Sequence, residues 1–208
     1  MKEIDENTCE SRLKTLKYST AIHEAGHAIA LINSGQKFAF ITNNEHDKQD
    51  FLGFIRIDSR IVPKNLININ SFKDYCIFLL AGEICTMKYE NIRTGHDLDF
   101  KDFVFDIMCS TCSMELIGDL QEVFNIVEAY HLSRKKKYSV EGKIYRLFDN
   151  LIDITEELFT NSDGEDTLLW RQVIKIADEL VIRKILYYTD VLQIIEELNV
   201  TENRALAS

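Results

Sequence analysis

Two histidines and a glutamate near the start of the chain have the types and spacing of a metal-dependent hydrolase. His23, Glu24 and His27 read H-E-x-x-H, a signature in which one helix supplies two zinc ligands and a general base. Residues four positions apart share one face of a helix, so both imidazoles can point at a single ion. Glu24 would stand beside that ion, where its carboxylate could take a proton from bound water. The pattern predicts that His23 and His27 bind Zn²⁺ and that Glu24 is catalytic.

A buried histidine pair with a purely structural role is the alternative. The chain has 5 histidines among 208 residues, so the pattern could also arise by chance. The helix expected over about 14–34 is apolar on nearly every side, which indicates that it is buried. Burying two imidazoles and a carboxylate is costly unless another group pairs with them. The surroundings therefore favour a metal site.

Three segments of the chain resemble the FtsH-type zinc metallopeptidases. Ala21–Ala30 is similar to the active-site helix of that family, Phe78–Glu83 to a second helix, and Thr94–Leu98 to the segment that carries the third zinc ligand. The similarity extends weakly over about residues 18–198. It implies a mainly α-helical, zincin-like peptidase domain with a small β-hairpin beside the active-site helix.

The resemblance also implies which residue completes the metal site. The third ligand of the family is an aspartate, which falls on Asp97 of this chain. A carboxylate there would stand at the first turn of a predicted helix, where Asp97 could instead act only as an N-cap. The other candidates for the third position are Asp99, His96 and Glu83.

Composition and charge limit the class of protein. The apolar share of 46% is enough for a core, and 1 proline with 8 glycines favours a mostly helical chain. The formal net charge of −10 argues against non-specific binding to nucleic acid. The 5 cysteines are an odd number and no secretory leader is visible, so we expect reduced thiols and a cytoplasmic location.

The family that the chain resembles is membrane-anchored and carries an ATPase module. This sequence has no apolar run approaching the ~20 residues of a membrane span. It also has no G-x-x-x-x-G-K-S/T loop for ATP. We therefore expect hydrolysis without ATP by the isolated chain, with a homo-oligomer or a separate ATPase partner left open.

The chain is expected to form a single domain, 1–208, in two parts. The zinc-site half, about 14–113, would comprise the H-E-x-x-H helix, strands at 37–42 and 51–58, a linker at 63–71, and helices over 72–90 and 97–113. The C-terminal helical part, about 115–200, would comprise three or four helices over 115–131, 139–159 and 166–198, the last of them a short helix at 191–198 capped by Asp190. The tail after residue 200 is expected to be disordered.

These features together predict a zinc-dependent metallopeptidase acting on peptides or unfolded proteins. Zinc-bound water would attack the scissile carbonyl, and Glu24 would pass its proton to the leaving amine. Two alternatives stay open: a non-catalytic zinc-stabilised interaction domain, and a partner-specific cytosolic regulatory protease with the same helix. Metal binding without cleavage of any protein would favour the first alternative.

Overall fold

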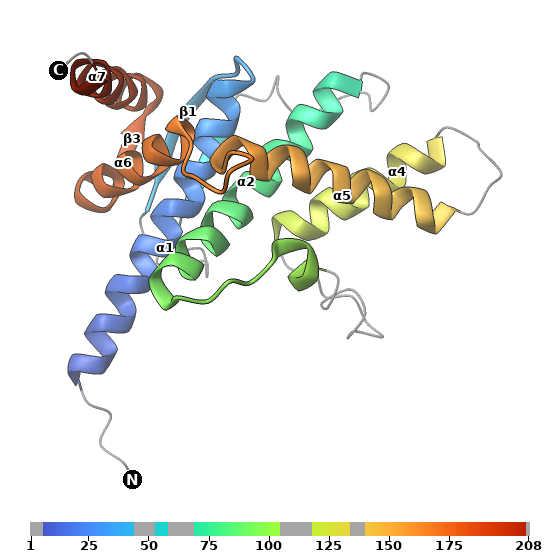
Figure 1. The fold of residues 1–208 in the computed structure, drawn as a ribbon, viewed down its shortest axis with the longest axis horizontal. Helices are drawn as coiled ribbons and strands as arrows, with labels where there is room; N and C mark the ends of the chain where they lie inside the picture. Colours follow the sequence, from blue (N-terminus) through green and yellow to red (C-terminus); the bar gives the residue numbers. More distant parts are fainter. Residues whose placement is uncertain (1–5, 44–52, 58–68, 105–117, 134–139, 207–208) are drawn as a thin grey trace, which may run out of the picture.

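Helices make up most of the chain in a computed structural model of the protein (Figure 1). The structure describes residues 6–43, 53–57, 69–104, 118–133 and 140–206. The helices in these ranges include residues 100–104 and α1 (Glu6–Asn33), α2 (Ile69–Thr94), α4 (Asp119–Ser133), α5 (Val140–Phe159), α6 (Leu168–Arg183) and α7 (Tyr188–Leu206). The strands are β1 (Phe38–Thr42), β2 (Phe54–Ile57) and β3 (Ile185–Tyr187). The prediction of a mainly helical fold is confirmed, and the predicted β-hairpin is part of a three-stranded antiparallel sheet.

The helix that carries the two histidines is the central element of the fold. α1 packs against α2 and α6, and both strands of the β1–β2 hairpin contact it. Its middle section is buried as the sequence predicts, with fully or almost fully enclosed side chains at Ala21, Ile22, Ala25, Ala28 and Ile29. The helix ends at the predicted stop signal, where Gly35 has a φ of 74° and its N–H donates to the Ile32 carbonyl at 2.9 Å.

α1 and α2 cross so closely that neither Gly26 nor Gly82 has room for a side chain. A Cβ atom built on Gly26 of α1 would lie 2.6 Å from the carbonyl oxygen of Ala81 and 3.0 Å from the sulfur of Cys85. On α2, a Cβ atom built on Gly82 would lie 2.5 Å from the ring nitrogen Nε2 of His27. Both distances are shorter than real Cβ contacts allow, so glycine is required on each helix. The two glycines thus bring the helices together at the level of the histidines.

The sheet lies beside α1 with β1 as its middle strand, in the order β2-β1-β3. Phe40 of β1 pairs with Arg56 of β2 on one side and with Tyr187 of β3 on the other. Ile41 and Leu186, the next pair along, are fully buried and join the core that includes α1. β2 therefore forms one edge of the sheet as the structure describes it.

The C-terminal part differs from the prediction in two places. The periodicity predicts helix as far as Leu186, but α6 ends at Arg183 and the left-handed backbone of Lys184, φ 64°, turns the chain. The next three residues form β3, because pairing with β1 buries Leu186. A strand this short gives no readable alternation in the sequence. The expectation of a disordered tail is wrong for most of its length, since α7 continues to Leu206.

Other element boundaries shift by a few residues. α2 continues to Thr94, although we expected it to end near residue 90. The helix predicted over 97–113 is described only at 100–104, and most of the predicted linker falls outside the described residues. Among the helices that the structure describes, none is long and apolar enough to cross a membrane.

Replacing Gly26 with alanine tests the helix crossing. In an open helix this change would stabilise the protein by about 1 kcal/mol, because alanine is the better helix former. At the crossing the new methyl group would meet backbone atoms of Ala81, so we expect the free energy of unfolding to fall by about 1–3 kcal/mol. Chemical denaturation measures the change, and Ser19→Ala on the same helix serves as a control. Stabilisation by Gly26→Ala would contradict the crossing.

Candidate metal centre

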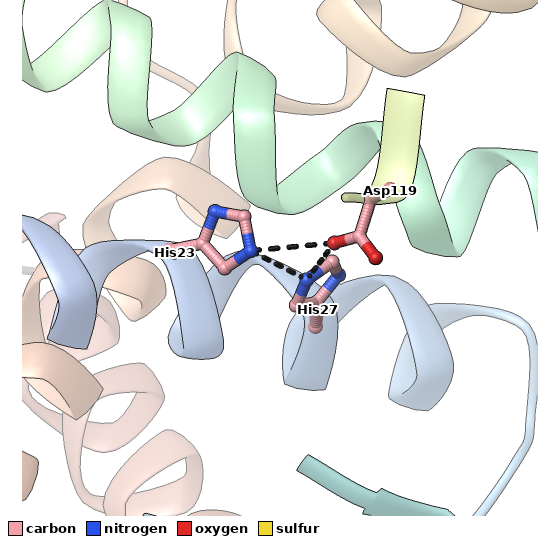
Figure 2. A group of neighbouring side chains, drawn as sticks. All are labelled: His23, His27 and Asp119. Atoms are coloured by element: carbon pink, nitrogen blue, oxygen red, sulfur yellow. Dashed lines mark hydrogen bonds and ion pairs between the residues drawn. The ribbon is translucent and has the colours of Figure 1, made fainter. Parts of the chain in front are cut away.

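Two histidines of α1 and one aspartate of α4 converge on a single point (Figure 2). His27 Nε2 lies 3.0 Å from His23 Nε2 and 2.9 Å from Asp119 Oδ2, and His23 Nε2 lies 3.3 Å from the same oxygen. Two ligands of a tetrahedral zinc ion, each about 2.0–2.1 Å from the metal, are about 3.3 Å apart. The three atoms are therefore spaced much like three ligands of one zinc ion.

Hydrogen bonds on the far side of each ring determine which nitrogen faces this point. His27 Nδ1 lies 2.7 Å from the Phe78 carbonyl oxygen, which can only accept, so Nδ1–H is the donor. The Thr86 hydroxyl donates to the Gly82 carbonyl at 2.8 Å, so its oxygen accepts from His23 Nδ1–H at 3.3 Å. With Nδ1 protonated in both neutral rings, both Nε2 atoms present lone pairs. This is the tautomer that metal-binding histidines need.

The third converging group adds negative charge. Burial alone would raise the pKa of Asp119, but hydrogen bonds and charge interactions with His23 and His27 outweigh it and hold the pKa below its usual range. This lowering requires positive charge at the Nε2 side of the rings, because two neutral imidazoles protonated on Nδ1 would neither donate to the carboxylate nor attract it. Two nitrogen lone pairs and an anionic oxygen repel one another at such distances unless positive charge lies among them. A single proton satisfies one pair of these atoms, whereas a divalent cation satisfies all three.

Packing between α4 and α2 holds Asp119 in place. The Tyr75 hydroxyl of α2 donates to Glu122 of α4 at 2.5 Å. The rings of Phe72 and Tyr130 stack with their centroids 4.3 Å apart. These contacts fix the first turn of α4, where Asp119 is the first residue, against the face of α2 that meets the histidines.

The structure places the predicted third ligand, Asp97, outside this group. Asp97 is exposed and lines a separate, larger cavity of about 530 Å³. Its turn follows the end of α2 at Thr94, roughly three helical turns or about 18 Å along the axis from Gly82. Gly82 is the residue that contacts the imidazoles. The carboxylate beside the two rings is that of Asp119, so the structure does not bring Asp97 together with His23 and His27.

The other candidates for the third position do not join the group either. His96 and Asp99 are exposed in the same turn as the predicted ligand. Asp99 Oδ1 accepts from the Asp102 N–H at 3.0 Å, which is a helix-capping contact. Glu83 lines the cleft around the histidines, but its carboxylate is not one of the converging atoms.

Asp119 lies inside the helix predicted over 115–131, so its position gave no reason to expect a ligand. Two signals in the chain do point to it. Like Asp97, Asp119 closely follows a glycine and precedes a leucine. Gly118 has a φ of 68°, a backbone conformation that favours glycine, and α4 begins directly after it. An aspartate at the first position of a helix can reach a site beside the helix end, whereas a residue in the middle of the helix faces the flank.

Glu24 lies in the same cleft, and one of its carboxylate oxygens has no partner in the part of the chain that the structure describes. The residue is 5% exposed, and Oε2 is buried without a hydrogen bond to any described residue. Burial is the main cause that raises the pKa of Glu24 to about 7, with His23 lowering it and Asp119 raising it further. Gly53 leaves room for this carboxylate, since a Cβ atom there would lie 3.0 Å from Glu24 Oε1.

The cleft that contains these groups has a volume of about 400 Å³. The side chains of His23 and Asp119 are 23% and 27% exposed, so solvent reaches the converging atoms. α1, α2, α4 and β2 form its walls, and its lining includes Phe54, Ile55, Ile57, Tyr75, Phe78, Leu79, Glu83 and Glu122.

No family model matches the chain, and no curated protein matches it. We therefore infer the chemistry of the cleft from the geometry of its own residues.

Replacing Thr86 with valine tests how the His23 ring is held. The change removes the oxygen that accepts from His23 Nδ1–H, and loss of such a partner typically weakens metal binding by about 10–100-fold. Thr155 is a matched control, because its hydroxyl donates to the Leu151 carbonyl at 2.7 Å in the same way but outside the cleft. We expect lower zinc affinity for Thr86→Val and recovery in Thr86→Ser. Equal zinc affinity for Thr86→Val and Thr155→Val would contradict the assigned tautomer.

Proposed function

We propose that this protein is a zinc-dependent metallopeptidase of the FtsH-like, zincin-like type. The observation that carries the proposal is a buried Glu24 carboxylate, one oxygen of which has no hydrogen-bond partner among the described residues, in the same open cleft as His23, His27 and Asp119. The segments that resemble the family support it: the H-E-x-x-H helix is α1, and Gly82 of the second segment contacts both imidazoles.

The donor set suits zinc in a catalytic site. Two imidazole nitrogens and one carboxylate oxygen are typical zinc ligands, and three protein ligands with an open fourth position are the catalytic pattern. A structural zinc site would be closed by a fourth protein ligand. Among the described residues the group has three members, and its His23 and Asp119 side chains are partly exposed toward the cleft.

In the proposed reaction Glu24 moves the proton. When bound, zinc would act as a Lewis acid that polarises the scissile carbonyl and lowers the pKa of water from 15.7 to about 7. Glu24 would accept a proton from the attacking water and donate it to the leaving amine, so that the products are a carboxylic acid and an amine. Burial raises the pKa of Glu24 in the metal-free cleft, which favours a group that must both accept and release a proton near neutral pH.

The sheet offers a place for an extended substrate. β2 forms an edge of the described sheet, and Phe54, Ile55 and Ile57 line the cleft. A peptide can add to such an edge as a further strand, with main-chain hydrogen bonds supplying much of the affinity. In that position its backbone would pass beside Glu24, which Gly53 approaches just before β2.

The same glutamate argues against a purely structural zinc domain. A buried polar atom without a hydrogen bond costs about 1–3 kcal/mol, and more when it is charged. A domain that only needed metal for stability would gain from an apolar residue at position 24. Keeping a carboxylate there makes sense if the group reacts.

Glu24→Gln tests the proposal. The amide keeps the shape of the side chain but cannot accept the proton, so we expect zinc binding to be retained and peptide hydrolysis to fall by at least about 100-fold. Zinc content is measured by atomic emission, and cleavage with an unfolded protein such as casein. Glu179→Gln on α6, outside the cleft, should keep full activity.

Undiminished cleavage by Glu24→Gln would contradict the mechanism. Zinc bound by the wild type without cleavage of any protein would instead support the zinc-stabilised interaction domain.

A further inference from the structure

The cleft contains two carboxylates that have no role in the proposed reaction. Four carboxylates line it, and no lysine or arginine does so among the described residues. Asp119 is assigned to the metal and Glu24 to proton transfer, and a divalent cation would balance their two charges. The charges of Glu83 and Glu122 remain without such a role.

These two glutamates border the metal centre from different helices. Glu83 directly follows Gly82, whose backbone contacts both imidazoles. Glu122 lies one helical turn after Asp119 on the same face of α4, where it accepts the hydrogen bond from Tyr75. A carboxylate accepts several hydrogen bonds, so this contact leaves Glu122 able to bind a second donor. Within the described part of the chain, no ion pair involves either glutamate.

The wall of the cleft next to these two glutamates is apolar, and this combination limits which substrate side chains fit. Phe54, Ile55 and Leu79 give the cleft an apolar surface next to the carboxylates. Lysine and arginine side chains combine an apolar stem with a cationic head, and they bury the stem along such a surface while the head stays near polar groups. An acidic side chain in the same place would meet like charge.

We propose that the cleft selects peptides with a lysine or arginine close to the bond that is cut, with Glu83 and Glu122 binding the cationic head. This inference rests on the proposed peptidase function and adds the substrate class to it. Guanidinium binds carboxylates in a bidentate manner, so arginine should be bound at least as well as lysine.

The test uses pairs of internally quenched peptides that are identical except for lysine or glutamate on both sides of the central bond. We expect kcat/KM to be roughly tenfold higher for the lysine peptide, and this ratio to fall as salt screens the exposed charges. Replacing both Glu83 and Glu122 with glutamine should bring the ratio to within about twofold. Glu128→Gln, exposed on α4 outside the cleft, should leave the ratio unchanged.

Binding separates this inference from the proposed function. The zinc-loaded Glu24→Gln variant should bind the lysine peptide more tightly than the glutamate peptide in fluorescence anisotropy, by the same factor. Cleavage without charge preference, or a preference that survives the double variant, would overturn the inference and leave the peptidase function intact. Charge-selective binding by a wild type that cleaves nothing would overturn the peptidase function and leave the selectivity of the cleft intact.

Discussion

The close crossing of α1 and α2 is the constraint on which the rest of this structure depends. Gly26 and Gly82 remove the side chains that would hold the helices apart. At the resulting distance, the Phe78 carbonyl and the Thr86 hydroxyl of α2 reach the imidazoles of α1 and accept their Nδ1 protons. Backbone packing thereby fixes the tautomer of both rings, and the tautomer decides that the Nε2 lone pairs face the cleft.

The electrostatics of the cleft follow from the same packing. The carboxylates of Glu24 and Asp119 lie near the two imidazoles, and Glu24 Oε2 is buried without a hydrogen-bond partner among the described residues. An unsatisfied buried group of this kind costs about 1–3 kcal/mol, which is a large share of the 5–15 kcal/mol that stabilises a typical domain. A bound divalent cation would remove most of this cost.

Local patterns could be predicted from the sequence, whereas contacts between distant segments could not. The spacing of His23 and His27 places both rings on one face because helical geometry needs only four residues. The apolar residues around them predict a buried helix, and the middle section of α1 is buried. The mainly helical character follows from composition and periodicity in the same way.

Asp119 and β3 illustrate what local patterns miss. The aspartate enters the site because α4 docks on α2, and a resemblance confined to short segments placed the third ligand on Asp97 instead. Ile185–Tyr187 is a strand only because β1 lies beside it. Gly82 carries no sign in the sequence that its missing side chain makes room for His27. In each case the deciding partner lies far away along the chain.

The most direct measurement is the zinc affinity of two matched variants, Asp119→Asn and Asp97→Asn. Each change removes one charge from an aspartate near a helix start and leaves the side-chain volume nearly unchanged. If Asp119 completes the site, Asp119→Asn should lower zinc affinity by more than about 100-fold, beyond the effect of losing an outer hydrogen-bond partner. Asp97→Asn should bind zinc like the wild type. The reverse result, with zinc retained by Asp119→Asn and lost by Asp97→Asn, would contradict the candidate metal centre formed by His23, His27 and Asp119.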